Sequence, residues 1–537
     1  MLNLEEFRLS MNVDAFIINV ERDKETTQKL CGFTGTNGVL IVMKEGKCQF
    51  FTDGRYLLQA NNQLNKDLFD IYNIHKKNPW EWVSKVLSYD TTLGYNSSKF
   101  TINNIRKYED ICKLVPHFIK IMDQELNIVQ HPIEYCGENS EEKCTRIAKT
   151  LDEPLLITCQ ESVSWLLNIR DENAKYTPSV SCPVILYKDC TVDLFVQKDF
   201  FLPEKHVNTL GVEELHSALN KLGAIILDPN FTLMNIKNLI ESARIIEKDD
   251  PCIINKAIKN KIEIRGMKSA HIRDGIAVTN FLYWLENNKG ITELDAEEKI
   301  LEYRKRQNLF KQPSFRTISA FNENGAIIHY GADQSTNKVI KEHGLYLIDS
   351  GGQYLDGTTD VTRTVAIGTP SHEQITYYTL VLKAHIAIAS SVFPSNTTGG
   401  ELDILARIHL WKYGIDYMHS TGHGVGSYLS VHEGPQGIVK GNNIRLVPNM
   451  ILSNEPGYYI ENKYGMRIEN LMYINTRSDG FLYFKPLTCV PLDKKLINKN
   501  MLIEEEINWI NNYHKFVYEN LVDHVVDKKW LKEICKI

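Results

Sequence analysis

Five residues carry side chains that together could bind metal ions and activate water: Asp349, Asp360, His423, Glu455 and Glu469. Each lies in a short segment that is rich in glycine or reads as a strand. Four carboxylates and one imidazole are hard, oxygen-rich ligands, and their negative charge exceeds what one divalent cation needs. The set suits two neighbouring divalent cations that share bridging carboxylates and a bridging hydroxide, which is the chemistry of a hydrolase.

Each of these carboxylates has a more ordinary explanation when it is taken alone. An aspartate in a glycine-rich turn usually bonds its own backbone, and a glutamate at a strand end is usually solvated. Asp349 and Asp360, however, both adjoin apolar strands that would bury them. Glu469 lies inside an otherwise apolar strand. Since buried carboxylates are rare unless they are paired or bind metal, the set favours a metal site.

Three histidines, His419, His423 and His432, fall within fourteen residues of glycine-rich sequence. A lone histidine is more often a hydrogen-bonded polar residue than a ligand, but three at this spacing favour a site. There is no HExxH motif, because His432-Glu433 is followed by Gly-Pro-Gln, and the zincin class is therefore excluded. Nor does a GxSxG motif support a Ser-His-Asp enzyme. From the residues alone we predict a dimetal hydrolase.

The segments that hold these residues read as strands. GLYLIDSGG is an apolar strand that ends near Asp349, and TTDVTRTVAIG is a strand that starts near Asp360. Paired as an antiparallel hairpin, they would let the two aspartates face one another. MILSNEPGYY reads as a strand that stops at Glu455. GMRIENLMYI reads as one strand in which Arg467 and Glu469 point together into the site.

Length and composition indicate a soluble protein of several domains. A chain of 537 residues exceeds one ordinary domain, and 43% hydrophobic with 24% charged residues lets each domain bury a core. The net charge of −6 gives no general attraction to nucleic acid or to an anionic membrane. Eleven cysteines without a CxxC pair indicate a reduced compartment. Glu5 and Glu6 stand where a signal peptide would be basic, and no apolar run reaches the roughly 20 residues of a membrane helix. We therefore expect a cytoplasmic protein with no membrane segment.

We predict three units, over residues 1–125, 126–254 and 255–537. In the first two, short apolar runs bounded by turn signals predict the strands of α/β domains: DAFIINV, GVLIVM and CQFFTDGRY, then DEPLLIT, PVILY, DLFV and AIILD. The third unit holds the candidate ligands. It opens with long helices, one of which has a core-facing stripe that Asp274 interrupts; the stripe residues are Met267, Ala270, Ala277, Phe281 and Trp284. EEEINWINNYHKFVYENLV near its end reads as a packing helix.

The motifs, in their order along the chain, resemble those of aminopeptidase P, the Xaa-Pro aminopeptidase family of pita-bread metallopeptidases. In the third unit they are IIHY, YLIDSGGQYLDGTTDVTRT, HSTGHGVGSYLSVHEGP, NEPGYY and RIEN. GFTGTNGVLIV with TDGRYLLQA resembles the family's N-terminal domain, SWLLNIRDEN its second domain and EEINWINNYH its C-terminal tail. The resemblance therefore touches all three units, as in the three-domain long form of the family.

The resemblance implies a mixed α/β (α+β) fold of the creatinase kind. Two smaller α/β domains would precede a pita-bread catalytic domain, in which helices flank a curved antiparallel sheet. It also implies a homodimer. Carried over motif by motif, the dimetal ligands of the family fall on Asp349, Asp360, His423, Glu455 and Glu469. The usual metal of the family is Mn²⁺, which agrees with so many carboxylates.

The resemblance further implies hydrolysis of the bond between a free N-terminal residue and a following proline, by a hydroxide that the two cations activate. Glu455 would accept the proton of the attacking water and pass it to the leaving nitrogen. His329 in AIIHY, His419 and His432 match the family's non-ligand active-site histidines, and Arg467 matches its active-site arginine. His432 and His329 would donate hydrogen bonds to the oxygens where charge develops. Arg467 and His419 would orient ligands and substrate.

Three alternatives share this fold. Prolidase has the same site and cleaves Xaa-Pro dipeptides, but TDGRY and the long STGHGVGSYLSVHEGP loop resemble aminopeptidase P more closely. Creatinase uses the fold without metal and is disfavoured because the ligand set is complete. Non-catalytic binding modules of this fold typically lose metal ligands, whereas this chain keeps charges that are costly to bury unless metal neutralises them.

Overall fold

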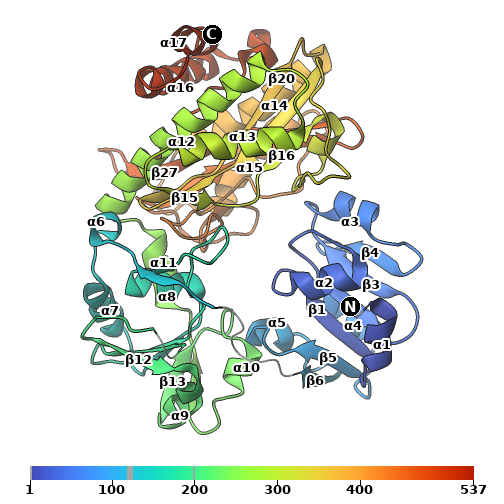
Figure 1. Cartoon of the computed structure of the whole chain (residues 1–537), viewed down its shortest axis with the longest axis vertical. Helices are drawn as coiled ribbons and strands as arrows, with labels where there is room; N and C mark the ends of the chain where they lie inside the picture. The colour runs from blue at the N-terminus through green and yellow to red at the C-terminus, as the bar shows by residue number, and fades with distance from the viewer. Residues whose placement is uncertain (1–2, 118–124, 198–199, 537) are drawn as a thin grey trace. The chain divides into compact units, whose positions relative to one another are not determined.

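The computed structural model describes residues 3–117, 125–197 and 200–536, which form two compact units (Figure 1). Unit 1 comprises residues 1–128, 140–167 and 180–252. Unit 2 comprises residues 129–139, 168–179 and 253–537, and it contains every residue that the sequence proposes for the site.

Unit 1 contains two six-stranded mixed sheets, in the orders β4-β3-β2-β1-β5-β6 and β12-β11-β10-β8-β13-β14. The first sheet consists of β1 (Ala15–Asn19), β2 (Val39–Met43), β3 (Cys48–Thr52), β4 (Phe69–Asn73), β5 (Thr92–Asn96) and β6 (Lys113–His117). The second consists of β8 (Leu155–Ile157), β10 (Val184–Leu186), β11 (Val192–Val196), β12 (Val207–Gly211), β13 (Ala224–Leu227) and β14 (Arg244–Glu247). The strands predicted from apolar runs in both regions are confirmed. Their β-branched and aromatic side chains suit a buried sheet.

The helices of unit 1 are short. They are α1 (Leu4–Ser10), α2 (Lys24–Cys31), α3 (Leu57–Gln63), α4 (Pro79–Val86), α5 (Ile102–Arg106), α7 (Ser140–Ala148), α8 (Gln160–Leu167), α9 (Leu215–Asn220) and α10 (Met234–Lys237). The 3₁₀ helix η1 spans Val212–Glu214, and α11 (Pro251–Ala257) leads from unit 1 into unit 2.

Unit 2 is built on small sheets and long helices. Its sheets have the orders β16-β17-β20, β21-β28-β27-β24, β15-β18-β19, β22-β23, β25-β26 and β7-β9. The strands are β7 (Ile128–Gln130), β9 (Ile169–Asp171), β15 (Phe310–Pro313), β16 (Ile318–Phe321), β17 (Gly344–Ser350), β18 (Gly352–Tyr354), β19 (Gly357–Thr358), β20 (Val361–Ile367), β21 (Val392–Phe393), β22 (Gly422–His423), β23 (Gly437–Ile438), β24 (Ile451–Asn454), β25 (Gly457–Ile460), β26 (Tyr464–Arg467), β27 (Asn470–Thr476) and β28 (Leu482–Pro486). The helices are α6 (Ile133–Cys136), α12 (Lys261–Asn287), α13 (Glu293–Lys305), α14 (His372–Ala389), α15 (Gly399–Trp411), α16 (Glu504–Leu521) and α17 (Lys528–Ile534), with 3₁₀ helices η2 (Asn322–Ala326), η3 (Lys494–Leu496) and η4 (Lys499–Met501).

Helix α12 confirms the predicted core-facing stripe. Met267, Ala270, Ala277 and Phe281 are fully buried, and Trp284 packs half-buried against the hydrophobic cluster that contains Phe281. Asp274, which interrupts the stripe, is buried as well. Both of its oxygens accept hydrogen bonds from Arg304, from Nε at 2.8 Å and from Nη2 at 3.0 Å. An ion pair with this bidentate geometry explains how a carboxylate stands on the apolar face.

Helix α16 packs as predicted, with Ile510, Tyr513, Val517 and Leu521 in the main core of unit 2. That core also contains residues of α14, α15, β24 and β27, so it supports the strands that lead to the candidate ligands. Across the described residues, none of the helices combines the length and the apolar character that a membrane span requires.

Candidate metal centre

The candidate ligands lie together in two overlapping groups. Ligand atoms of Asp349, Asp360 and Glu469 lie within 4.8 Å of one another, and the same holds for His423, Glu455 and Glu469. Glu469 belongs to both groups, which makes it a candidate bridging carboxylate. The structure therefore brings together all five residues that the sequence proposes as ligands; they are called the ligand cluster below.

The two aspartates come from paired strands, as predicted, but they are not direct partners. Strand β17 pairs antiparallel with β20, and Asp349 lies opposite Thr362. Asp360 directly precedes β20, after β18 and β19 have formed a separate small sheet with β15. The expectation that the two aspartates face one another across antiparallel strands is confirmed for their side chains, whose ligand atoms lie within 4.8 Å of one another. Only the backbones are offset, because Asp349 lies opposite Thr362.

The two glutamates lie just beyond the last residue pair of another antiparallel ladder. In the antiparallel pair of β24 and β27, Asn454 lies opposite Asn470. Glu455 follows Asn454 and Glu469 precedes Asn470, so both glutamates continue beyond that rung. The predicted strand end at Glu455 is confirmed, since β24 stops one residue earlier.

The expectation of one continuous strand from Gly465 to Ile474 is wrong. Strand β26 ends at Arg467 and pairs with β25, whereas β27 begins at Asn470 and pairs with β24. Arg467 and Glu469 still converge as predicted, because both contact one hydroxyl. Arg467 Nε donates to Thr362 Oγ1 at 3.1 Å, and that hydroxyl donates to Glu469 Oε2 at 2.9 Å.

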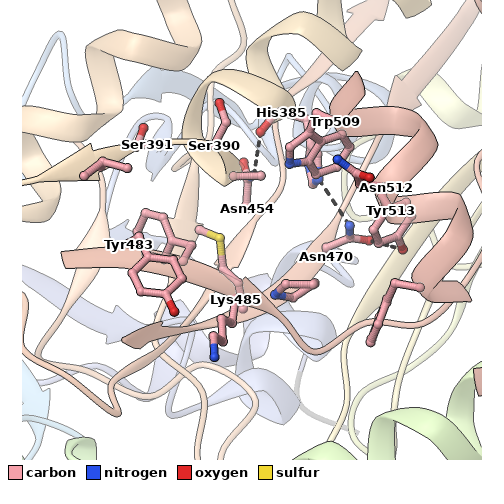
Figure 2. A pocket seen from close by; sticks show the side chains of 16 residues that line it. His385, Ser390, Ser391, Asn454, Asn470, Tyr483, Lys485, Trp509, Asn512 and Tyr513 are labelled. Atoms are coloured by element: carbon pink, nitrogen blue, oxygen red, sulfur yellow. Dashed lines mark hydrogen bonds between the residues drawn. The ribbon is translucent and has the colours of Figure 1, made fainter. Parts of the chain in front are cut away.

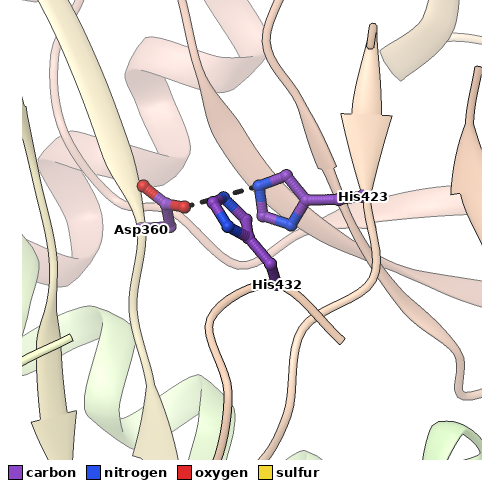
Figure 3. A group of neighbouring side chains, drawn as sticks. All are labelled: Asp360, His423 and His432. Carbon is purple, nitrogen blue, oxygen red and sulfur yellow. Dashed lines mark ion pairs between the residues drawn. The ribbon is translucent and has the colours of Figure 1, made fainter. Parts of the chain in front are cut away.

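His423 is held with one ring nitrogen toward the carboxylates. Its Nδ1 lies 2.9 Å from the carbonyl oxygen of Gly424. A carbonyl can only accept, so Nδ1 carries the proton and Nε2 keeps a lone pair for a ligand. Nε2 lies 3.6 Å from Asp360 Oδ2 (Figure 3) and 3.6 Å from Glu455 Oε1. These separations are too long for hydrogen bonds and leave room for a cation among the three groups.

The charges in the ligand cluster are poorly compensated by the protein. Burial, together with the neighbouring carboxylates, raises the pKa of Asp360 and of Glu469 well above their usual range. Burial and then Glu469 raise the pKa of Glu455 to about 8. Within the described part of the chain, Asp349 Oδ1 and Asp360 Oδ1 are buried without a hydrogen-bond partner. Unpaired carboxylate oxygens of this kind fit a site for divalent cations.

Arg467 and His419 border the ligand cluster and are joined by one tyrosine. Arg467 Nη2 donates to Asp349 Oδ2 at 2.5 Å, and its Nη1 donates to the hydroxyl of Tyr459 at 2.6 Å. That hydroxyl lies 2.9 Å from His419 Nε2. On its other side, His419 Nδ1 lies 3.7 Å from Glu455 Oε2. The arginine thus holds one ligand, Asp349, whereas His419 lies beside another, Glu455, and its Nδ1 donates to the carbonyl of Ser420 at 2.7 Å.

The other two predicted histidines lie in loops. His432 is exposed, and its ring stands perpendicular to that of His423 with 4.2 Å between the centroids (Figure 3). A ring nitrogen of His432 also lies within 4.8 Å of ligand atoms of Asp360 and His423. His329 is half-buried in the turn after η2, and η2 packs against β26, the strand that ends at Arg467.

Tyr459 and Thr362 belong to the site although neither was predicted from the sequence. Tyr459 lies in the motif NEPGYY, but its pairing with Gly465 across the β25–β26 ladder is a tertiary feature. Thr362 and Thr364 alternate in TTDVTRT and therefore point to one face of β20. Both bond Arg467, Thr364 through the backbone N–H and carbonyl of the arginine. That alternation of threonines was a signal that could have been used.

A buried ion pair on α15 supports the loop that carries His419. Asp403 Oδ2 accepts from Arg407 Nε at 2.8 Å, and Arg407 Nη2 donates to the carbonyl of His419 at 2.7 Å. Asp403 Oδ1 accepts from the hydroxyl of Thr421, whose carbonyl in turn accepts from the backbone N–H of Glu455 at 2.7 Å. Helix α15 therefore helps to position both a ligand and its neighbouring histidine.

Comparisons with known proteins agree with this geometry. Metallopeptidase family M24 matches residues 265–476, and the family's C-terminal region matches 480–537. Creatinase/prolidase N-terminal domains match residues 9–123 and 122–263. Xaa-Pro aminopeptidase 1 of Dictyostelium discoideum is 34% identical, over 99% of this chain and 95% of its own. The chain belongs to metallopeptidase family M24. A probable Xaa-Pro aminopeptidase P of Talaromyces marneffei is 33% identical, over 100% and 92% of the two chains.

Solved structures extend the agreement to the fold. X-prolyl aminopeptidase from Caenorhabditis elegans, described as a cytosolic enzyme with a di-nuclear active site, matches with a TM-score of 0.90 at 31% identity, over 98% of this chain and 96% of that one. Prolidase from Pyrococcus horikoshii matches with a TM-score of 0.56 at 25% identity, over 65% of this chain and 99% of that one. The predicted creatinase-like fold and the resemblance to Xaa-Pro aminopeptidases are confirmed, and the chain is a hydrolase of that kind.

Proposed function

We propose that this chain removes the N-terminal residue from peptides that carry proline at the second position. The convergence of the ligand cluster, with Glu469 common to two groups of ligand atoms, is the observation that carries the proposal. The match to Xaa-Pro aminopeptidases along nearly the whole chain supports the substrate class. Proline requires a dedicated enzyme because its nitrogen carries no N–H and its ring fixes φ.

We assign two divalent cations, Mn²⁺ in each case, to the ligand cluster. Asp349, Asp360 and Glu469 would hold one cation, and His423, Glu455 and Glu469 the other. Carboxylates that are crowded, buried and partly without partners fit this role, and so does the free Nε2 of His423. When bound, the cations supply a water-derived nucleophile at neutral pH and draw electron density from the scissile carbonyl.

Glu455 is our choice for the proton carrier. One of its oxygens lies beside His423 Nε2 at 3.6 Å and the other beside His419 Nδ1 at 3.7 Å, so it stands between the ligand cluster and the neighbouring histidine. It takes a proton from the attacking water as the new C–O bond forms. It then delivers that proton to the proline nitrogen as the C–N bond breaks.

The remaining residues bind and orient. We propose that His432 and His329 donate hydrogen bonds to the carbonyl oxygen and the gem-diolate oxygen of the reacting carbon. Negative charge develops on these oxygens during the reaction. Arg467 holds Asp349 and His419 holds Tyr459, so these two side chains act on ligand geometry.

We also propose the setting of the enzyme. A division into residues 1–125, 126–254 and 255–537 agrees roughly with the ranges of the family matches. A cytoplasmic location is supported by the cytosolic description of the Caenorhabditis elegans structure. A homodimer rests on the family resemblance alone.

A comparison of two substrates tests the function against its main alternative. The metal-free chain, reloaded with Mn²⁺, is offered an Xaa-Pro-Xaa tripeptide and the corresponding Xaa-Pro dipeptide. We expect cleavage of the tripeptide with release of the free N-terminal residue. Preference for the dipeptide would instead indicate a prolidase. The solved prolidase covers only 65% of this chain, which argues against that alternative. A protein that binds no metal and cleaves neither peptide would be a binding module.

A further inference from the structure

A cavity of about 550 Å³ lies in unit 2 and takes no part in the proposed reaction (Figure 2). Its lining comes from β24, β27, β28, the end of α14 and α16. Helix α16 supplies most of the aromatic surface. Trp509 and Tyr513 stack with 5.3 Å between ring centroids and 6° between planes, and Phe516 lies beside them in the lining. A cavity of this size with aromatic walls suits a small, flat molecule.

Among the described residues that line the cavity, two buried polar atoms lack a hydrogen-bond partner, Asn454 Oδ1 and His385 Nδ1. Asn454 is fully buried, and its Nδ2 donates to the backbone carbonyl of His385 at 2.8 Å (Figure 2). Because that carbonyl can only accept, the orientation of the amide is determined and Oδ1 is its free acceptor. Among the described residues, nothing donates to this oxygen. A ligand with an N–H or O–H group would satisfy it.

The charge of the lining narrows the kind of ligand that the cavity would bind. Lys485 is the single Lys, Arg, Asp or Glu among the sixteen lining residues, and it is half-buried. Its Nζ lies 5.8 Å from the centroid of the Tyr483 ring. Within the described part of the chain, no ion pair neutralises the charge of Lys485. The lining therefore favours a negatively charged group on the ligand.

The cavity and the ligand cluster share two backbone segments. Asn454 and Asn470 lie opposite one another in the ladder and both line the cavity. The adjoining residues, Glu455 and Glu469, belong to the ligand cluster. Arg363 strengthens this connection, since it donates to Asn470 Oδ1 at 2.8 Å and to the carbonyl of Glu469 at 2.7 Å. A molecule that displaces either asparagine would move the backbone that holds a proposed metal ligand.

We propose that this cavity is a second ligand site, for a flat aromatic anion with an N–H or O–H donor, and that its occupancy changes the metal affinity of the ligand cluster. The cavity itself stands apart from the peptidase reaction. Only the coupling rests on the proposed function, because it uses Glu455 and Glu469 as metal ligands. Coupling between two sites is reciprocal, so metal must change the affinity of the cavity by the same factor.

The test uses 8-anilinonaphthalene-1-sulfonate, an aromatic anion with one N–H, titrated by fluorescence into the full chain. Ala389→Trp fills the cavity, and Ser390→Trp narrows it from an exposed position, so that at least one variant keeps the fold. Ala387→Trp is the matched control, because Ala387 lies on the same helix, is equally half-buried and is outside the lining. Circular dichroism and Tm verify the folding of each variant.

We expect saturable binding to the metal-free wild type and to Ala387→Trp, and a Kd at least about tenfold weaker in Ala389→Trp and Ser390→Trp. Adding Mn²⁺ should shift the wild-type Kd about fivefold or more. Equal binding by the wild type and both cavity variants would overturn the site. A Kd that Mn²⁺ leaves unchanged, in a protein shown to bind Mn²⁺, would overturn the coupling. Since the first comparison needs neither metal nor substrate, its failure is distinguishable from failure of the peptidase assignment.

Discussion

Arg467 donates a hydrogen bond of 2.5 Å to Oδ2 of Asp349, and the other oxygen of that aspartate is buried without a partner in the described part of the chain. The guanidinium thus fixes the carboxylate and leaves one oxygen for a cation. Arg467 itself is fixed by Tyr459 and Thr362. Ligand geometry in this site therefore depends on a residue that is not itself a ligand.

Arg467→Lys should weaken Mn²⁺ binding. A lysine keeps the charge but cannot reach Asp349, Tyr459 and Thr362 together, because it lacks the planar fork of donors. Loss of a residue that orients a ligand typically costs about 10- to 100-fold in metal affinity. Competition with a fluorescent chelator measures this. Arg477→Lys, at an exposed position, serves as the control and should bind Mn²⁺ normally. Equal affinity in Arg467→Lys and the wild type would contradict the positioning role.

Glu455→Gln should lower kcat on a proline peptide by about 10³-fold or more, because it removes both a proton acceptor and a negatively charged ligand. Asp360→Asn should act in the same direction. Steady-state assays and Tm measurements separate loss of chemistry from loss of fold. Glu461→Gln changes an exposed glutamate in the nearby turn between β25 and β26 and should leave kcat unchanged. Near-full activity of Glu455→Gln would rule out its proposed role.

The metal-free protein should lose stability as pH rises. Burial and Glu469 raise the pKa of Glu455 from 4.5 to about 8, so between these values the folded state holds a proton that the unfolded state has released. Stability then falls with rising pH across this window. Burial raises the pKa of Asp360 and Glu469 in the same direction.

Calorimetry at intervals from pH 5 to pH 8 measures this loss. Bound Mn²⁺ replaces the protons as the neutralising charge, so the loaded protein should be protected. Glu455→Gln should flatten the metal-free curve, since the group that titrates is gone. If the Tm of the metal-free protein rises over this pH range, burial and mutual repulsion do not destabilise the ionised carboxylates.

Replacing only one partner of the buried ion pair between Asp274 and Arg304 should lower the stability of the protein. Arg304→Met leaves an uncompensated buried carboxylate, and such changes cost about 3–5 kcal/mol. Replacing both partners, as in Asp274→Leu with Arg304→Met, should recover most of that loss because no buried charge remains. Midpoints of urea unfolding measure both variants. A single variant as stable as the wild type would mean that water reaches Asp274.

Several features of the site were readable from residue types and their local segments. Asp349 and Glu469 stand in apolar segments, where a carboxylate needs a reason, and the glycine-rich loop with His419 and His423 carries more histidine than turns require. The stripe on α12 was readable for the same reason, since periodicity reports which face is buried. The partner of Asp274 was not, because Arg304 belongs to another helix.

Other features depend on which segments meet. The strand break between Arg467 and Asn470 cannot be predicted from the apolar pattern of the segment, because it arises where β26 and β27 pair with different strands. Tyr459 acquires its role only from the proximity of Arg467 and His419. The offset of Asp349 and Asp360 follows from the register of β17 and β20, and a turn of that length permits more than one register.

The most direct test of the account is an assay with two peptides that differ only at the second position, proline in one and alanine in the other. Both are offered to the metal-free chain and to the Mn²⁺-loaded chain, and release of the N-terminal residue is measured. We predict cleavage of the proline peptide alone, and only with Mn²⁺. Metal-independent cleavage, or equal cleavage of the alanine peptide, would contradict the account.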